Sequence, residues 1–483
     1  MKRLIAAVCL LSSLTACNSL IVPPPAAYGP TPSERQLKWH QLEFYGFLHF
    51  TVNTFTDKEW GYGDEGEDVF NPTDFSAEQI VSAAKMSGMK GLILTAKHHD
   101  GFCLWPSQYT EHSIKNSKWM DGKGDVVGAI EKECRKQGLK FGVYLSPWDR
   151  NHAEYGTPAY ITYYRNQLRE LLTQYGDIYE LWWDGANGGD GYYGGAREKR
   201  KIDNLTYYDW PNTLKIVREL QPDAVVFSDG GPDIRWIGNE KGIAGEPCWA
   251  TFNRDGTAPG HADRQSLNHG DRPGTHWVPG ECDVSIRPGW FYHAKEDDKV
   301  RSPENLVDLY YKSIGRGASF LLNLPPDRRG RIHENDVASL KAFRRIIDAT
   351  FKTNLAAGAT VTASNTRGNA SVYEPANVLD DDRDTYWTCD DEATSAELIV
   401  KLPRAVTFNV VDIREYIQLG QRVDNWSVDY LVNGQWTTFA TGQSIGNRRL
   451  WRGDAPITAD HIRLRVSGPV CPAISAFGLY REP

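Results

Sequence analysis

Residues 178–191, IYELWWDGANGGDG, predict a short buried strand that stops at the carboxylate of Asp184 and continues into a glycine-rich loop. A carboxylate at the C-terminal end of a strand, beside a loop that can admit a ligand, suits chemistry better than support. The alternative is an N-cap or Asx-turn aspartate, which is what most Asp-Gly pairs are. Paired tryptophans before Asp184 and no helical pattern after it favour the functional interpretation, so Asp184 is the candidate nucleophile.

Around this stretch, strand-like and helix-like segments alternate. Strands are expected at residues 45–50, 91–96, 141–146, 180–183, 224–228, 282–287 and 320–324. Helices are expected at residues 76–88, 125–137, 157–175, 210–220, from 302 onward, and 333–350. Residues 229–280 are Gly-rich and carry no clear pattern. Repeated β-then-α units favour a (β/α)8-type barrel over residues 35–352 rather than an open doubly wound sheet. No Gly-x-Gly-x-x-Gly follows the first strand, which weakens a nucleotide-binding alternative.

After Thr353 the helical periodicity disappears, and short segments with alternating polar and apolar residues take over. They lie at residues 397–402, 406–414, 426–430 and 462–466. This pattern is typical of a small β-sandwich, which we assign to residues 353–483. The chain is therefore expected to hold one large α/β domain and one smaller all-β domain.

The first residues resemble a bacterial lipoprotein signal. Lys2 and Arg3 precede an apolar run, and Leu14-Thr15-Ala16-Cys17 follows it. Residues 1–16 would be removed, Cys17 would carry the lipid, and residues 17–34, rich in proline, would form a tether. The alternative is an ordinary secretory signal cut near the same place. In either case we expect export, and with the lipid a place in the cell envelope, on the periplasmic side or the cell surface.

Composition limits the class of partner. The net charge is -8 and basic residues form no cluster, which argues against nucleic acid. The 16 Trp and 23 Tyr residues suit stacking against the C–H faces of a neutral sugar, although aromatics also fill cores. Besides Cys9 and Cys17, six cysteines remain; export permits disulfides among them, and 15 pairings are open. Cys389 and Cys471 are the only two in the C-terminal domain, and no Cys-x-x-Cys or His-Glu-x-x-His spacing suggests zinc.

Polar clusters at other expected strand ends should meet Asp184. His49 ends the first strand, and the second runs into His98 and His99, which suit hydrogen bonds to sugar hydroxyls better than a metal. Glycoside cleavage needs a second carboxyl group. Its candidates are Glu240, Glu246 and Glu281, each in a Gly-bearing loop near an expected strand end. Glu240 ranks first because Arg235 and Trp236 could organise its loop and desolvate the acid, which would raise its pKa.

Six motifs in order resemble the α-L-fucosidases of glycoside hydrolase family 29. They are His49-Phe50, Lys97-His-His-Asp-Gly-Phe102, Leu181-Trp-Trp-Asp-Gly-Ala186, Gly231-Pro-Asp-Ile-Arg-Trp-Ile-Gly-Asn-Glu240, Glu281-Cys-Asp-Val-Ser-Ile-Arg-Pro-Gly-Trp290 and Leu321-Leu-Asn-Leu-Pro325. The resemblance implies an exo-acting, retaining enzyme on a distorted barrel, with Asp184 as nucleophile and no catalytic metal or other cofactor. The stretch that ends at Glu240 resembles the subfamily acting on α-1,3 and α-1,4 linked fucose of branched glycans, which makes Glu240 the acid/base.

The same resemblance implies a fucose pocket. Its lining would be His49, Glu59, Trp60, His98, His99, Tyr144 and Trp290, with Trp290 beside the C6 methyl group. The expected partners are fucosylated oligosaccharides or glycoconjugates, with no nucleic acid and with the membrane reached only through the lipid. The loop from Asn187 to Asn204 is longer than in the family pattern. It follows Asp184, so we expect it to affect the part of the site that binds the leaving group. Two alternatives stay open, another retaining exo-glycosidase on a similar barrel and a non-catalytic glycan-binding protein.

The C-terminal segment resembles discoidin-like carbohydrate-binding modules. Its stretch from Asn377 to Trp387 is similar to the loop that often holds calcium in those modules, which implies a structural calcium ion near Asp380, Asp382 and Thr385. The glutamate often found near the end of the module is missing from residues 475–479, so a purely structural sandwich is an equal alternative.

Overall fold

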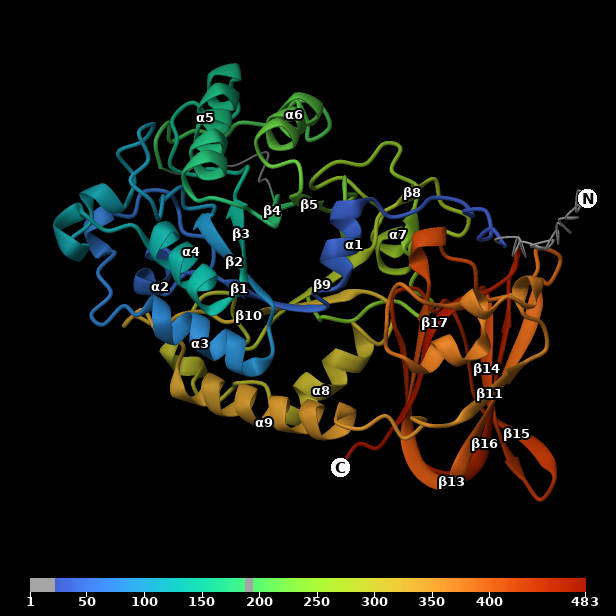
Figure 1. Ribbon diagram of the computed structural model, residues 1–483. Coiled ribbons are helices and arrows are strands. Elements are labelled where there is room, and N and C mark those ends of the chain that lie inside the picture. Colours follow the sequence, from blue (N-terminus) through green and yellow to red (C-terminus); the bar gives the residue numbers. More distant parts are fainter. Residues whose placement is uncertain (1–21, 187–193) are drawn as a thin grey trace, which may run out of the picture.

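The computed structural model describes residues 22–186 and 194–483. Figure 1 shows a barrel wrapped by helices and, at its side, a part built of long strands. The barrel strands are β1 (Phe44–Leu48), β2 (Gly91–Lys97), β3 (Lys140–Leu145), β4 (Glu180–Trp182), β5 (Val225–Ser228), β6 (Ile234–Trp236), β9 (Gly280–Ser285) and β10 (Ser319–Asn323). They are all parallel and close in the order β1-β10-β9-β6-β5-β4-β3-β2. The predicted barrel is confirmed.

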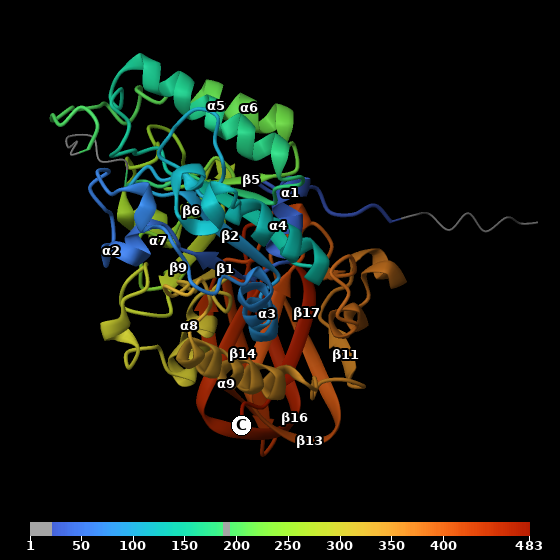
Figure 2. The same ribbon diagram turned by 90° about the vertical axis from the view of Figure 1, so that its left-hand side faces the viewer.

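The helices cover the outside of the barrel (Figures 1 and 2). They are α1 (Glu34–His40), α2 (Val52–Thr56), α3 (Ala77–Ser87), α4 (Val126–Gln137), α5 (Pro158–Gln174), α6 (Trp210–Leu220), α7 (Arg264–His269), α8 (Pro303–Lys312) and α9 (Glu334–Phe351). Their ends follow local sequence rules. The Ser76 hydroxyl caps α3 by accepting from the Gln79 backbone N–H, and Gly88, at φ 95°, ends the same helix.

One strand departs from the expected alternation. β6 follows β5 directly through the turn at residues 229–233, with no helix between them. Gly231 makes this turn with a φ of 99°, a conformation that side-chain-bearing residues avoid. The region left unassigned between residues 229 and 280 thus supplies a barrel strand, a short hairpin of β7 (Thr251–Phe252) and β8 (His276–Trp277), and α7.

The C-terminal part is an antiparallel β-sandwich, as predicted. Its strands are β11 (Thr360–Ala363), β12 (Trp387–Thr388), β13 (Ser395–Glu415), β14 (Asn425–Val432), β15 (Gln435–Gln443), β16 (Arg449–Ser467) and β17 (Ala473–Tyr480). They pair in the order β12-β17-β13-β16-β14-β15, and β11 adds to β13. An irregularity in the pairing of β13 with β16, between Lys401 and Val406, interrupts these long strands. Alternate residues of these strands form a separate apolar core.

A buried charge network joins the two parts. The carboxylate of Glu43, just before β1, accepts hydrogen bonds from Arg383 at 2.5 Å and from Arg448 at 2.9 Å. Arg448 also donates to Asp412 at 2.8 Å and to the Tyr310 hydroxyl of α8 at 3.0 Å. Burial disfavours the charge of Glu43, but the surrounding arginines hold its pKa far below the ordinary value. The sandwich therefore binds the barrel through ion pairs in which Arg448 is shared by one carboxylate from each part.

Residues 22–33, which form all but the last residue of the described part of the predicted tether, lie along the sandwich (Figure 1). The Tyr28 N–H donates to the Leu419 carbonyl at 3.0 Å. Arg367 donates to the Pro23 carbonyl at 2.7 Å, and Arg422 to the Ala26 carbonyl at 2.9 Å. Proline carbonyls and a chain with few N–H donors suit this arrangement, because arginines of the sandwich supply the hydrogen bonds. We call residues 22–33 the N-terminal strap.

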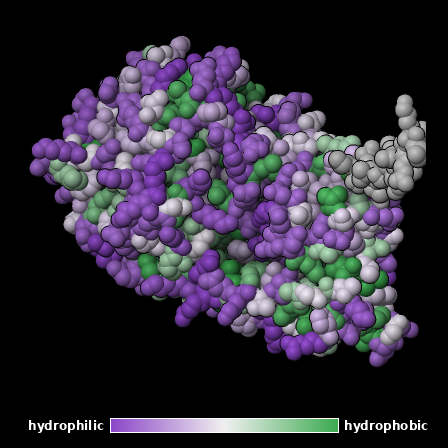
Figure 3. Space-filling view, in the orientation of Figure 1, coloured by the Kyte–Doolittle hydropathy of each residue, from purple (hydrophilic) through white to green (hydrophobic). Residues whose placement is uncertain are grey.

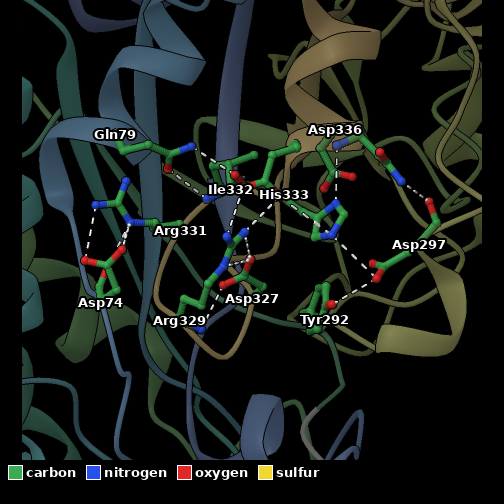
Figure 4. A network of polar contacts seen from close by, with 12 residues as sticks. Asp74, Gln79, Tyr292, Asp297, Asp327, Arg329, Arg331, Ile332, His333 and Asp336 are labelled. Atoms are coloured by element: carbon green, nitrogen blue, oxygen red, sulfur yellow. Dashed lines mark hydrogen bonds and ion pairs between the residues drawn. The ribbon is translucent and has the colours of Figure 1, made fainter.

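A second polar network ties the loop before α9 to α3 (Figure 4). Gln79 of α3 makes two backbone hydrogen bonds with Ile332, both 2.9 Å long. Arg331 pairs with Asp74 at 2.7 Å, and Arg329 pairs with Asp327 and with Glu334. These contacts join the last βα loop to the first long helix and so close the outer layer.

The face in Figure 3 is mainly hydrophilic, with hydrophobic residues in small patches, several of them on the sandwich. In the described ranges, no helix combines the length and apolar character that crossing a membrane requires. Six cysteines are free and buried, so the structure contains no disulfide between described residues. Cys389 and Cys471 are among these thiols.

Candidate active site

A cavity of about 400 Å³ opens at the carboxyl ends of the barrel strands. Residues that follow β1, β2, β4, β5, β6 and β9 converge on it, as parallel strands in a closed barrel require. Its side chains include Phe47, His49, Glu59, Trp60, His98, His99, Trp182, Asp184, Phe227, Asp229, Trp236, Glu240, Arg264, Asp283 and Trp290. The candidate nucleophile, the first candidate acid and six of the seven expected pocket residues thus share one cavity. The seventh, Tyr144, contacts Asp184 from the side.

Asp184 comes two residues after the end of β4 at Trp182. Its Oδ1 accepts a hydrogen bond from the Ala186 backbone N–H at 2.7 Å, and its Oδ2 accepts from the Tyr144 hydroxyl at 2.7 Å. The described residues after Asp184, Gly185 and Ala186, are not helical, and the bond from the Ala186 N–H is the contact of an Asx turn, which the sequence also allowed. Both oxygens are held in place by neutral donors, which fixes the direction in which the group faces the cavity.

The electrostatics of Asp184 favour its neutral form. Burial raises the pKa of Asp184 to about 7, and the negative charges of Asp229 and Glu240 act in the same direction. The hydrogen bonds from Ala186 and Tyr144 oppose this effect. A carboxyl group with a pKa near neutrality is unusual outside functional sites.

The three histidines of the cavity are neutral, and hydrogen bonds orient two of them, His49 and His99. Burial lowers the pKa of His49 and of His99 to about 3, and that of His98 well below its ordinary value. The Ser146 hydroxyl donates to the Trp148 carbonyl at 2.6 Å, so it accepts from Nδ1–H of His99 at 2.7 Å. His49 Nδ1–H donates to the Asn323 side-chain oxygen at 2.9 Å. His49 and His99 therefore keep Nε2 as an acceptor for a ligand hydroxyl, whereas Nδ1 of His98 has no hydrogen-bond partner among the described residues.

His99 Nε2 lies 3.6 Å from Asp184 Oδ2. One ligand atom from each of His98, His99 and Asp184 lies within 4.8 Å of the others, an arrangement that could also hold a metal ion. The expectation that the site works without a metal therefore stays a prediction.

Glu59, Trp60 and Trp290 form the rim. The carboxylate of Glu59 accepts from the backbone N–H of Trp290 at 2.9 Å and lies 2.6 Å from Nε2 of His293. Burial lowers the pKa of His293, but the carboxylates of Asp57 and Glu59 on its two sides raise it above the ordinary value overall. Trp60 is 52% exposed, as a residue at the mouth would be. The Trp290 indole donates to Glu240 at 3.2 Å.

The structure separates the three candidate acids. Glu240 lines the cavity, whereas Glu246 pairs with Arg316 and Arg449 next to the sandwich. Glu281 is fully buried near the amino end of β9, away from the cavity. Neither alternative can protonate a leaving group bound beside Asp184. The expected desolvation of Glu240 is wrong, because this residue sits exposed at the mouth.

Arg235 does organise the loop, as expected. Its buried guanidinium donates to the carbonyls of Leu267 at 2.8 Å and Trp249 at 2.9 Å, which fixes the segment after β6. Trp236 donates instead to Asp283 Oδ1 at 2.7 Å.

Two acidic residues of the cavity were missed. Asp229 follows β5 as Asp184 follows β4, and burial raises its pKa to about 6. Asp283 lies within β9; burial, then the charges of Glu240 and Glu281, raises its pKa well above the ordinary value. The sequence contains a signal for each residue. Asp229 directly follows a predicted strand, and Asp283 belongs to the polar series Glu281, Asp283 and Ser285, which alternates with apolar residues. Part of the long loop after Asp184, residues 187–193, lies outside the described residues.

The loop expected to hold calcium is described in full. Asp380 accepts from the Asp382 backbone N–H at 2.9 Å and from the Thr385 hydroxyl at 2.7 Å, and Asp382 accepts from the Asp384 N–H at 2.9 Å. The carboxylates thus bind their own loop. Calcium binding here stays a prediction.

Comparisons with known proteins agree with this geometry. The family model for α-L-fucosidase matches residues 31–348, and that for the F5/8 type C domain matches residues 360–477. The chain is 43% identical to α-L-fucosidase 1 of Arabidopsis thaliana over 98% of this chain and 92% of that protein.

Two solved structures resemble it as well. A putative α-L-fucosidase from Bacteroides thetaiotaomicron is 42% identical with a TM-score of 0.87, over 95% of this chain and 99% of that one. A Ruminococcus gnavus GH29 fucosidase in complex with fucose is 34% identical with a TM-score of 0.85, over 95% and 97% of the two chains. The chain therefore belongs to the α-L-fucosidases, a family of glycoside hydrolases.

Proposed function

We propose that this enzyme removes terminal α-L-fucose from branched glycans by a retaining mechanism, with Asp184 as nucleophile and Glu240 as acid/base. One observation carries the proposal. Asp184, held by Tyr144 and Ala186 at the end of β4, shares a cavity with the exposed carboxyl group of Glu240. One carboxyl group deep in a pocket and a second at its mouth suit an exo-acting enzyme that protonates an outward-facing leaving group.

Two displacements complete the reaction. In the first, the Asp184 carboxylate attacks the anomeric carbon, the glycosidic C–O bond breaks, and the Glu240 carboxylic acid gives its proton to the departing oxygen. In the second, the Glu240 carboxylate takes a proton from water, the water oxygen attacks the same carbon, and the bond to Asp184 breaks. The anomeric configuration is inverted twice and so retained.

The lining suits a 6-deoxy sugar. Nε2 atoms of neutral histidines and the Glu59 carboxylate offer acceptors for three ring hydroxyls. Trp290 and Phe47, with ring centroids 6.4 Å apart, offer an apolar surface for a methyl group.

The nucleophile is tested by chemical rescue. Asp184→Ala should abolish hydrolysis of an aryl α-L-fucoside, and azide should restore part of it and yield β-fucosyl azide, because the small anion enters the space left by the carboxylate. Asp229→Ala, a neighbouring acid in the same cavity, serves as the matched control. Azide rescue of Asp229→Ala in place of Asp184→Ala would move the nucleophile to Asp229.

The acid/base is tested by leaving-group dependence. Glu240→Ala should slow natural oligosaccharides far more than aryl fucosides with acidic phenols, because the latter need little protonation. Asp283→Ala is the control, since it removes another acid from the same wall. Equal losses of Glu240→Ala on both substrate types would contradict the assignment.

Preference for α-1,3 and α-1,4 linkages forms part of the proposal. A second hollow, lined by residues 252–253, 255–257, 260–263, 266 and 271, adjoins the cavity and shares Gly260 and Ala262 with it. This space supports binding of a second branch beside the fucosylated sugar. We expect a branched Lewis-type trisaccharide to be cleaved with a higher kcat/KM than linear α-1,2-fucosyllactose. The reverse order would refute this preference but leave the fucosidase assignment intact.

We also propose export and lipid attachment at Cys17, which rest on residues 1–21, outside the described part of the chain. Cys17→Ala should shift the protein from the detergent phase to the aqueous phase on Triton X-114 partition.

For the calcium proposal, adding calcium after chelation should raise the melting temperature of wild type and leave that of Asp380→Ala unchanged.

A further inference from the structure

Two glutamates meet beneath the floor of the cavity. Glu180 opens β4, and Glu281 lies near the start of β9, so both face the barrel interior at its amino end. Each is fully buried, and neither forms an ion pair with a described lysine or arginine. The Trp39 indole links them, because it donates to Glu180 Oε2 at 3.2 Å and to the Tyr45 hydroxyl at 2.9 Å, and that hydroxyl donates to Glu281 Oε2. Two ionised carboxylates could not share such a site, because nothing there would offset their repulsion.

The donors around the pair show where its negative charge lies. Glu281 Oε1 accepts from the Trp182 indole at 2.8 Å, and Glu281 Oε2 accepts a short hydrogen bond from the Tyr45 hydroxyl. Glu180 Oε2 accepts only a long bond from Trp39 at 3.2 Å, and its Oε1 meets no N–H or O–H donor. Burial and the neighbouring charge of Glu281 raise the pKa of Glu180 well above the ordinary value. Glu180 is therefore the acid and Glu281 the carboxylate.

Trp182 connects this pair to the reacting group. Its ring forms part of the cavity wall and stacks on Phe227 with centroids 4.0 Å apart and planes 10° apart. On the other side it stacks on Tyr144 at 5.4 Å and 26°. The Tyr144 hydroxyl in turn holds Asp184 at 2.7 Å. The direction of the indole N–H thus fixes a ring stack that ends at the proposed nucleophile.

We propose that Glu281 is a positioning residue, the carboxylate of a proton-sharing pair with Glu180, which fixes Trp182 in the pocket floor and through Tyr144 aligns Asp184. This inference rests on the proposed function of the cavity. Glu180 supplies the proton that lets two carboxyl groups coexist in the barrel. Its own charge is not needed.

Replacement by glutamine separates the two roles. Glu180→Gln keeps a neutral donor of the same size toward Glu281, so it should keep most of kcat/KM on an aryl α-L-fucoside. Glu281→Gln replaces one acceptor oxygen by an NH2 group, so the side chain can no longer accept from both Trp182 and Tyr45. We expect kcat to fall by roughly tenfold to a hundredfold with a smaller change in KM, because the nucleophile is misaligned. Equal losses in the two variants would overturn the proposal.

A second measurement does not depend on activity. The infrared difference spectrum of wild type minus Glu180→Gln should contain the C=O band of a buried protonated carboxyl group. Asp283→Asn is the matched control, because it removes another buried acid and should leave that band in place. A wild type minus Glu180→Gln spectrum without a C=O band would overturn the assignment of the proton, even if Glu281→Gln failed to fold. In a Trp182→Phe background, Glu281→Gln should add little further loss of kcat, and a full additional loss would contradict the path through Trp182. If wild type failed to cleave fucosides, the proposed function would fail while the infrared result still tested the pair.

Discussion

At the scale of single residues, burial and hydrogen bonding act in opposite directions on the charge of Asp184. Its position beneath the mouth removes it from water, which disfavours the charge that a nucleophile needs. Tyr144 and Ala186 offset part of this cost by donating hydrogen bonds to the ionised form. The pKa of about 7 is the balance of these effects. Small changes around this carboxylate should therefore be visible in the pH dependence of the reaction.

Tyr144→Phe should move the acidic limb of the kcat/KM profile to higher pH. The lost hydrogen bond favoured the ionised carboxylate, so its removal raises the pKa of Asp184 further. The check is kcat/KM on an aryl α-L-fucoside from pH 4 to 9. Tyr160→Phe is the control, because the Tyr160 hydroxyl donates to the Pro147 carbonyl and does not touch the site. An unchanged limb in Tyr144→Phe would show that another group sets it.

Asp184→Asn should stabilise the protein more at pH 8 than at pH 5. A carboxyl group with a raised folded-state pKa contributes its full stability below its unfolded pKa near 3.8, and this contribution is lost as pH rises toward 7. Asparagine stays neutral, so the gain at pH 8 reaches up to about 4 kcal/mol, at about 1.36 kcal/mol for each pH unit between the two pKa values. Urea unfolding at both pH values measures it. Asp223→Asn, on the surface, should show no such dependence, and an equal gain at both pH values would contradict the assignment.

At the scale of elements, the ends of β2 and β3 are held by one buried ion pair. Lys97 Nζ lies 2.9 Å from Asp149 and donates to the Gln167 side chain at 2.9 Å, with both charged groups almost fully buried. The ring face of Tyr163 also contacts Lys97, with 5.1 Å between Nζ and the ring centroid. Since His98 and His99 directly follow Lys97, this pair fixes the loop that carries them.

Lys97→Met should destabilise the protein by about 3–5 kcal/mol, because it leaves the Asp149 carboxylate buried without its partner. The free energy of unfolding from urea titration measures this loss. Lys38→Met is the control, since Lys38 pairs with Asp223 on the surface, where ion pairs contribute little. Similar losses in the two variants would show that the Lys97 ion pair is not what stabilises this edge.

Sequence patterns located most elements and failed at one. Seven barrel strands were predictable because each is a run of mainly apolar residues, and many of the helices between them have recognisable caps, such as Ser76 and Gly88 of α3. β6 was not, because its three residues, Ile234 to Trp236, include Arg235 and no helix separates them from β5. The missed strand β6 leads into the loop that carries Glu240. The motif around Glu240 was therefore recognisable in the sequence, but the position of Glu240 in the barrel was not. The choice between Glu240 and Glu281 as the candidate acid came from the structure. The two residues look alike in the sequence but lie at opposite ends of the barrel.

At the scale of the molecule, the barrel and the sandwich behave as one unit through Arg448. This residue contacts Glu43 of the barrel and Asp412 of the sandwich and is almost fully buried. A charged group shared in this way couples the folding of the two parts, since separating them would expose three ions that now neutralise one another.

Arg448→Met should split a single calorimetric unfolding transition into two. The substitution removes the cation that Glu43 and Asp412 share and leaves Arg383 beside Glu43 and Arg414 beside Asp412, so the polar link between the barrel and the sandwich is weakened at this point. Arg345→Met, at a site outside this network, is the control and should keep a single transition. A single transition in Arg448→Met would show that the remaining contacts between the two parts suffice to couple them.

The N-terminal strap would set the orientation of the enzyme relative to a membrane if Cys17 carried a lipid. It runs along the sandwich into α1, and Trp39 of α1 donates to Tyr45 and Glu180 at the amino ends of β1 and β4, opposite the catalytic mouth. Four residues separate Val22 from Cys17, so a fully stretched backbone can span at most about 18 Å between the two. With an acyl chain on Cys17, the sandwich would rest near the lipid headgroups and the mouth would point outward. Such an enzyme would be suited to trimming soluble glycans that diffuse past the cell rather than glycolipids of its own bilayer.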